Sequence, residues 1–254
     1  MNGNISPNPK KTGVAAPSRS DLNGICVAGI TPFTTIDFPG RLAGVFYLQG
    51  CPWRCRYCYN AEFWPLPPAG QNIPLEKILH FLDSRNSQLD GIVFSGGEPT
   101  VHERLPVWMK AVKDLGFEIG LHTGGVYPER LKEVLPVCNW VGFDMKAPFK
   151  LYDKVTQVKR SGDAVRKSAE ILVASRVPHE FRTTVHPGLL SEDEILEMAG
   201  ELAALGAQDY VIQSFHPEHC PDKELRESAV PGAGISQNLR STLRSLFPFF
   251  HVRE

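Results

Sequence analysis

Three of the chain's six cysteines, Cys51, Cys55 and Cys58, lie within eight positions in the segment GCPWRCRYCYN (residues 50–60). Thiols this close in sequence are suited to holding a metal centre. A disulfide framework fits poorly, because an odd cluster leaves one thiol unpaired. The spacing therefore indicates a metal site of some kind.

Two kinds of metal centre are compatible with three clustered cysteines. A structural zinc ion takes four ligands, usually from two Cys-x-x-Cys pairs, and the sequence has no second pair. A fourth ligand would have to come from a distant residue such as His80, His102, Cys138 or Cys220. A 4Fe–4S cluster on three cysteines instead leaves one iron open, much as a catalytic metal keeps an open position. The pattern favours such a cluster, with zinc as the alternative.

Further residues that could do chemistry come directly after short apolar runs. They form the segments SGGEP (95–99), HTGG (122–125), FDMK (143–146), FRTTVHPG (181–188) and QSFHPEH (213–219). Taken singly, each has an ordinary explanation, such as a tight turn, an ion pair or a turn histidine. Because all five come where an apolar run ends, we expect them to meet at one edge of a sheet.

The elements that must position these residues alternate between strands and helices. Buried strands are predicted at 43–50, 91–97, 117–125, 140–146, 180–188 and 210–215. Amphipathic helices are predicted at 74–84, 102–116, 161–175, 191–206 and 236–247. The repeated strand–helix units favour an α/β fold, an incomplete (β/α)6 TIM-like barrel, with a doubly wound open sheet as the competing architecture. We expect residues 1–21 to be a disordered lead-in and residues 22–254 to form a single domain.

Composition and charge limit the classes of function. The 27 Lys and Arg residues nearly balance the 28 Asp and Glu residues, which gives a net charge of −1. This balance provides no bulk attraction to nucleic acid or to a membrane, and neither is expected as a partner. No run approaches the roughly 20 apolar residues of a spanning helix, and the N-terminal residues do not resemble a secretory signal. We therefore expect a cytoplasmic protein, in which clustered cysteines favour metal binding or catalysis over disulfides.

The Cys-x3-Cys-x2-Cys spacing, with Tyr57 before the last cysteine, resembles that of the radical S-adenosylmethionine (SAM) superfamily. The resemblance implies a 4Fe–4S cluster with three cysteine ligands and one open iron, which the amino and carboxylate groups of SAM chelate. An electron from the cluster would cleave SAM to methionine and a 5′-deoxyadenosyl radical, so no protein side chain needs to act as a base. The residues implied to bind SAM here are Tyr57, Cys58, Tyr59, Gly96, Gly97 and Glu98.

The later segments resemble those of glycyl-radical-enzyme activases, one group within this superfamily. That resemblance implies further SAM contacts from Thr123, Asp144, Met145, Lys146, Arg182 and His216. Thr123 matches the threonine of an Asp-Thr-Asn-Gly segment in those proteins, but His122 and Gly124 replace its acid and its asparagine. The replacement puts in doubt the monovalent cation that some activases bind near the carboxylate of SAM.

The run TIDFPGR (35–41) before the cysteine loop resembles the family of anaerobic ribonucleoside-triphosphate reductase activating proteins. The resemblance implies a protein substrate, a glycyl radical enzyme that is most simply anaerobic ribonucleotide reductase. It also implies an electron donor such as flavodoxin or ferredoxin. The alternatives are an activase of the pyruvate formate-lyase type, a radical SAM enzyme acting on a small molecule, and a non-enzymatic zinc-binding interaction module.

Overall fold

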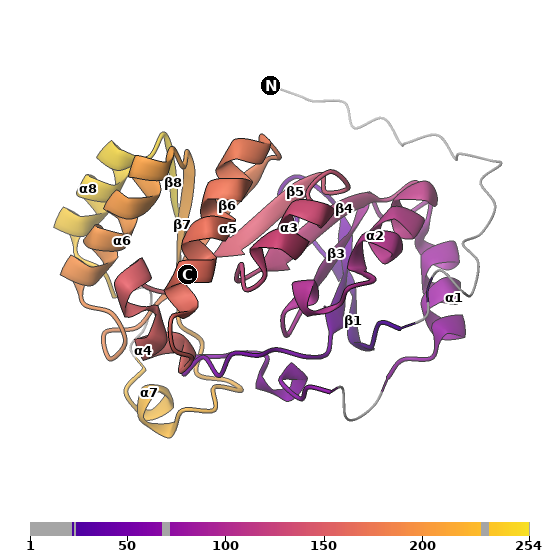
Figure 1. Cartoon of the computed structure of the whole chain (residues 1–254), viewed down its shortest axis with the longest axis horizontal. Helices are drawn as coiled ribbons and strands as arrows, with labels where there is room; N and C mark the ends of the chain where they lie inside the picture. Colours follow the sequence, from indigo (N-terminus) through magenta and orange to yellow (C-terminus); the bar gives the residue numbers. More distant parts are fainter. Residues whose placement is uncertain (1–21, 23, 68–71, 230–233, 254) are drawn as a thin grey trace.

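The computed structural model describes residues 22, 24–67, 72–229 and 234–253, which form one eight-stranded sheet with helices packed outside it (Figure 1). The first strand is antiparallel to the second, and the remaining neighbours are all parallel. The strands are β1 (Val27–Thr34), β2 (Ala43–Leu48), β3 (Gly91–Gly96), β4 (Glu118–Thr123), β5 (Trp140–Asp144), β6 (His179–Val185), β7 (Asp209–Ser214) and β8 (Phe249–Arg253).

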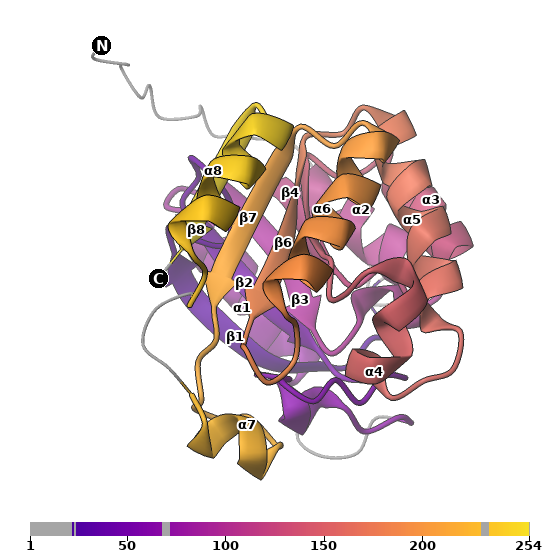
Figure 2. The ribbon, with the colours of Figure 1, turned by 90° about the vertical axis from the view of Figure 1, so that its left-hand side faces the viewer.

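The helices follow the strands and pack on the outer face of the curved sheet, where α6 and α8 lie beside β6, β7 and β8 (Figure 2). The helices are α1 (Leu75–Arg85), α2 (Leu105–Asp114), α3 (Pro128–Val134), α4 (Tyr152–Thr156), α5 (Ser161–Ser175), α6 (Glu192–Leu205), α7 (Lys223–Glu227) and α8 (Gln237–Leu246). Local signals set several boundaries. Ser191 and Glu194 form a capping box before α6, and Gly206 ends that helix at a φ of 94°.

The structure confirms the incomplete barrel. Each of the six predicted strands and five predicted helices is present within a few residues of its expected bounds. The spatial strand order follows the chain from β1 to β8, whereas a doubly wound sheet reverses its order at a switch point. Among the described residues, β1 and β8 do not pair with each other, so the sheet does not close. The predicted lead-in, residues 1–21, lies outside the described residues.

A small apolar cluster fills the amino-terminal end of the barrel interior. Its buried members are Phe38, Ala43, Val45, Val93 and Trp140, and the rings of Phe38 and Trp140 stack with centroids 5.8 Å apart. Gly91 makes room for this layer, because a Cβ there would lie 2.9 Å from the Phe38 ring and 2.8 Å from a backbone oxygen. This layer therefore fills the interior at the amino-terminal ends of the parallel strands.

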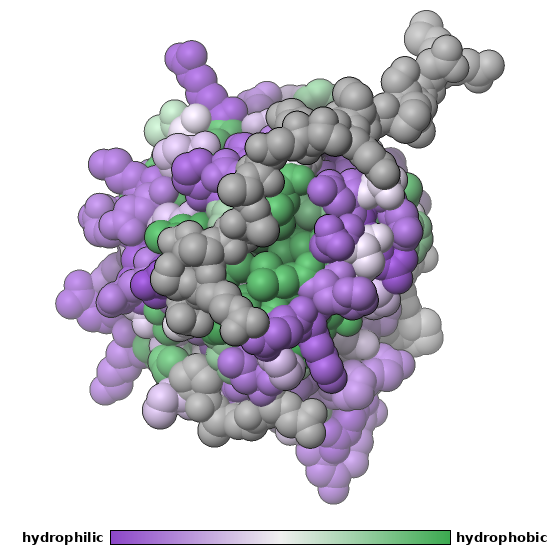
Figure 3. Space-filling model, turned by 90° about the vertical axis from the view of Figure 1, so that its right-hand side faces the viewer, coloured by the Kyte–Doolittle hydropathy of each residue, from purple (hydrophilic) through white to green (hydrophobic). Residues whose placement is uncertain are grey.

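The main hydrophobic core lies between the sheet and the helices and includes fully buried Phe46, Trp108, Phe143 and Tyr210. Apolar residues also gather in a hollow on the side of the molecule that carries α1, with hydrophilic residues along part of its border (Figure 3). None of the helices in the described ranges is long and apolar enough to cross a membrane.

Candidate functional site

A cavity of about 890 Å³ opens at the carboxyl ends of the parallel strands. Because parallel strands bring their carboxyl ends to one edge, segments far apart in the sequence meet around it. The predicted site residues that line it are Cys51, Cys55, Tyr57, Cys58, Tyr59, Gly96, Gly97, Glu98, Thr123, Asp144, Lys146, Arg182 and His216.

Met145 is the one predicted site residue that does not line the cavity. Side chains alternate at the end of β5, so Asp144 and Lys146 face the cavity while Met145 faces the helices. Its side chain is fully buried, with its sulfur 3.7 Å from the hydroxyl of Tyr152, and its carbonyl accepts a hydrogen bond from Thr183. The side chain of Met145 thus belongs to the core.

The cysteine loop directly follows β2 and is braced by α4. The backbone N–H groups of Arg54 and Arg56 donate to the carbonyls of Thr156 and Val155, at 3.0 and 3.1 Å. Burial raises the pKa of the Cys51 and Cys55 thiols to about 12, so both are protonated at neutral pH in the metal-free protein. Binding a metal centre there must therefore release protons.

The donor chemistry of this loop fits an iron–sulfur cluster. Within the described part of the chain, no three His, Cys, Asp or Glu side chains converge as ligands of one metal ion. A cube of four irons asks for a different arrangement, because each thiolate holds its own iron and the sulfurs need only face a common space. Cys51, Cys55 and Cys58 all line the same cavity, which meets that requirement.

The loop after β3 approaches the cysteine loop closely at Gly96 and Gly97. The N–H of Gly97 donates to the carbonyl of Leu48 at 2.9 Å, and the N–H of Glu98 donates to that of Gly50 at 2.8 Å. Gly96 has a φ of 115°, a conformation that favours glycine. The Gly96 carbonyl in turn accepts a hydrogen bond from the Asn60 side chain at 3.3 Å. The two loops thus form one hydrogen-bonded unit at the cavity edge.

The Glu98 carboxylate is buried and already accepts four hydrogen bonds from the protein. The donors are the backbone N–H and hydroxyl of Thr100 at 3.0 and 2.6 Å, the hydroxyl of Thr123 at 2.7 Å, and the N–H of Gly124 at 2.9 Å. Burial raises its pKa, and these hydrogen bonds oppose that effect. The carboxylate therefore joins the loops after β3 and β4, a structural role that sequence reasoning did not expect.

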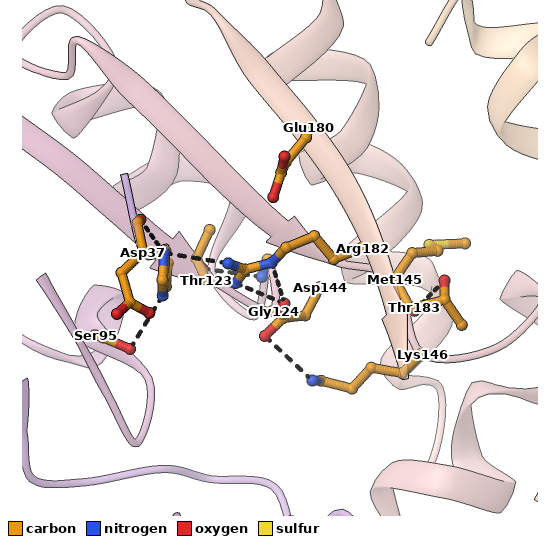
Figure 4. A network of polar contacts seen from close by, with 12 residues as sticks. Asp37, Ser95, Thr123, Gly124, Asp144, Met145, Lys146, Glu180, Arg182 and Thr183 are labelled. Carbon is orange, nitrogen blue, oxygen red and sulfur yellow. Dashed lines mark hydrogen bonds and ion pairs between the residues drawn. The ribbon is translucent and has the colours of Figure 1, made fainter. Parts of the chain in front are cut away.

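Arg182, Asp144 and Lys146 form a row of charged side chains in the wall of the cavity (Figure 4). The Arg182 Nε and Nη2 atoms lie 2.9 and 2.8 Å from Asp144 Oδ1, and Lys146 Nζ lies 3.7 Å from Asp144 Oδ2. Lys146 Nζ also donates to the Tyr57 hydroxyl at 3.5 Å. Burial alone would raise the pKa of Asp144, but Arg182 and Lys146 outweigh it and lower that pKa. Asp144 is therefore ionised, and two cations, Arg182 and Lys146, lie beside this one anion.

His122 links Arg182 to the segment before β2, a connection that sequence reasoning missed. Its Nε2 lies 2.9 Å from the carbonyl oxygen of Asp37 and 3.1 Å from Arg182 Nη1, and its Nδ1 lies 3.5 Å from the Ser95 hydroxyl. Burial, and next the charge of Arg182, lower the pKa of His122 to about 4. A neutral imidazole therefore lies at the cavity wall beside Arg182. Other cavity residues that sequence reasoning missed are Tyr47, Thr184, Gln213, Ser214 and Arg253.

The depressed pKa of His122 predicts a loss of stability in acid. Because the folded-state pKa lies below the ordinary value of 6.5, this residue favours the folded state above pH 6.5. That contribution falls as the pH drops from 6.5 toward 4, with a slope of at most about 1.4 kcal/mol per pH unit. The free energy of unfolding of the metal-free protein can be measured with urea between pH 4.5 and 7. It should fall more steeply with decreasing pH in wild type than in a His122→Gln variant. Parallel curves for the two proteins would contradict the assignment.

Comparison with known proteins agrees with the fold. Residues 45–202 match the family model of the Radical SAM superfamily, so the chain belongs to that superfamily. A putative glycyl-radical enzyme activating enzyme of Methanocaldococcus jannaschii is 29% identical over 212 residues, covering 81% of this chain and 86% of that protein. The pyruvate formate-lyase 1-activating enzyme of Escherichia coli K12 is 29% identical over 180 residues, covering 66% of this chain and 70% of that protein. The chain is therefore an activase-like member.

Solved structures share the fold at low sequence identity. Streptococcus suis SuiB bound to precursor peptide SuiA superposes with a TM-score of 0.62 and 14% identity, covering 83% of this chain and 48% of that chain. TYW1 with a lysine-pyruvate adduct superposes with a TM-score of 0.60 and 13% identity, covering 80% and 72%. The family makes this chain an enzyme and implies a 4Fe–4S cluster and SAM as its cofactors. It also sets aside the non-enzymatic zinc-binding module.

Proposed function

We propose that this chain is a radical SAM activase that generates a glycyl radical on a partner enzyme, anaerobic ribonucleoside-triphosphate reductase. The observation that carries the proposal is the meeting of the cysteine loop and the five later strand-end segments around one cavity. The activating-enzyme relatives support a glycyl radical enzyme as the partner. The TIDFPGR run before the cysteine loop favours the reductase among such enzymes.

In this proposal Cys51, Cys55 and Cys58 hold the cluster and leave one iron open. The bound cofactors supply the radical chemistry, in which reductive cleavage of SAM yields a species able to abstract hydrogen from glycine. Tyr57 and Tyr59 would flank the adenine, and His216 would contact the same cofactor from the loop after β7. The Gly96-Gly97 turn, which carries no side chain at either residue, would let its backbone approach the amino group of SAM.

The charged side chains of Arg182, Asp144 and Lys146 would orient SAM beside the cysteine loop. Arg182 and Lys146 outnumber Asp144 by one positive charge, which suits the carboxylate of an amino acid. Thr123 lies at the end of β4, where its hydroxyl donates a hydrogen bond to Glu98. Thr123 and the next residue, Gly124, both line the cavity. The protein residues thus bind and orient, and an electron donor such as flavodoxin or ferredoxin supplies the electron.

The partner can be tested directly with purified proteins. Reconstituted enzyme, SAM and reductant are mixed without oxygen with anaerobic ribonucleotide reductase, or separately with pyruvate formate-lyase, and electron paramagnetic resonance spectra are recorded. We expect a glycyl-radical doublet with the reductase and none with a reductase whose radical glycine is replaced by alanine. A doublet only with the lyase would move the proposal to that partner. No doublet with either protein, while 5′-deoxyadenosine accumulates, would favour a small-molecule substrate instead.

A further inference from the structure

Arg54 lies inside the cysteine loop, and none of the roles described above uses its side chain. Its Nη1 donates hydrogen bonds to the carbonyl oxygens of Cys51, at 2.8 Å, and Trp53, at 2.7 Å. Its backbone N–H donates to the carbonyl of Thr156 at the end of α4. The guanidinium is therefore held in place on the backbone of the loop, even though Arg54 is an exposed residue.

Trp64 connects Arg54 to a second cysteine of the loop. The guanidinium carbon of Arg54 lies 5.3 Å from the centre of the Trp64 ring, within the range of a cation–π contact. The Trp64 side chain hydrogen-bonds the Cys58 thiol, and its carbonyl accepts from the N–H of Cys51 at 3.3 Å. One guanidinium thus braces the loop at Cys51 directly and at Cys58 through the indole.

Arg54 differs from Arg56 in that no carboxylate among the described residues offsets its positive charge. Arg56 lies in the same loop, with its Nε 2.6 Å from Asp222 and its Nη2 3.3 Å from Glu224. Across the residues that the structure describes, no carboxylate pairs with Arg54, whose guanidinium donates to neutral carbonyls. The loop therefore carries two arginines of equal charge, one paired and one not.

We propose that Arg54 is a positioning residue for the cluster, which holds the cysteine loop in its binding conformation and makes the reduction potential of the bound cluster less negative. The electron that a one-electron donor delivers adds negative charge to the cluster, so a fixed, uncompensated cation nearby favours the reduced form. Solvent and salt screen an exposed charge, which limits the size of the effect. The inference rests on the cysteine ligands of the proposed function and is independent of the partner enzyme.

The test compares wild type with the variants Arg54→Gln, Arg54→Lys and Arg56→Gln. Each full-length protein is reconstituted without oxygen, its iron and sulfide are measured, and the cluster is titrated with dithionite in the presence of mediators. Electron paramagnetic resonance reports the reduced fraction, with no SAM or partner protein present. At a fixed solution potential, we expect Arg54→Gln to lower the ratio of reduced to oxidised cluster by about three- to tenfold, where tenfold is 59 mV for one electron.

The two other variants separate charge from structure. Arg54→Lys keeps the charge without the fork of donors, so most of the wild-type ratio should return. Arg56→Gln should change the ratio less than twofold, because its ion pairs already offset its charge. Equal ratios in wild type and Arg54→Gln, or equal shifts in Arg54→Gln and Arg56→Gln, would overturn the proposal. If Arg54→Gln holds no cluster, a Lys variant with the wild-type potential supports the proposal, and one with a more negative potential contradicts it.

The absence of SAM and partner protein keeps this test distinct from that of the proposed function. A wrong partner assignment would leave the potentials unchanged. A protein that never takes up iron and sulfide would instead contradict the cysteine ligands themselves. A normal cluster with no dependence on Arg54 would contradict only the inference made here.

Discussion

Replacing Cys55 by serine should abolish both the cluster and the cleavage of SAM. Cys55 is buried at the centre of the loop and lines the cavity with Cys51 and Cys58. A hydroxyl is a poor substitute for a thiolate as an iron ligand, so two cysteines would remain for the cube. Iron per chain after anaerobic reconstitution should fall from about four to below one, and 5′-deoxyadenosine formation should fall to the protein-free background.

A second buried cysteine provides the matched control for this change. Cys138 is 8% exposed, and its thiol donates to the carbonyl of Val134 at 3.4 Å, away from the cavity. Cys138→Ser should keep the iron content and the SAM cleavage of wild type. If Cys55→Ser retained about four irons per chain and full cleavage, Cys55 would not be a cluster ligand. Circular dichroism of both metal-free variants checks that the fold is intact.

Replacing Gly97 by alanine should damage the site through a steric clash. A Cβ at this position would lie 2.5 Å from the carbonyl oxygen of Gly50 and 2.8 Å from that of Phe63. Both neighbours are backbone atoms beside the cysteine loop, so the clash must displace the loop itself. We expect a loss of stability of about 1–3 kcal/mol and at least a tenfold loss of SAM cleavage. Urea unfolding and a 5′-deoxyadenosine assay measure the two effects.

Gly200 shows what the same substitution does without a clash. It lies within α6, and a Cβ there would meet nothing within 4 Å. Gly200→Ala should therefore stabilise the protein by about 0.5–1 kcal/mol, because alanine favours the helix more than glycine does. SAM cleavage should remain that of wild type. A Gly97→Ala variant that behaves like Gly200→Ala would show that the close approach of the two loops is not required.

The sequence alone determined the six central strands, the five longer helices and the edge at which the site lies. Strands of a parallel sheet are buried on both faces, so they appear as continuous apolar runs that end in polar or glycine-rich segments. Elements without such patterns were missed. Helices α4 and α7 have five residues each, too few for a helical period, and β1 is half-exposed along most of its length.

Only the tertiary structure decided what each side chain at that edge does. Met145 lies between two cavity residues in the sequence, yet strand alternation turns it into the core. The Glu98 carboxylate accepts hydrogen bonds from Thr123 and Gly124, which are 25 and 26 residues away in sequence. His122 meets Arg182 and the carbonyl of Asp37 across the barrel. Local patterns fix where strands begin and end. The contacts of these side chains depend instead on long-range packing, which brings segments distant in the sequence within hydrogen-bonding distance of one another.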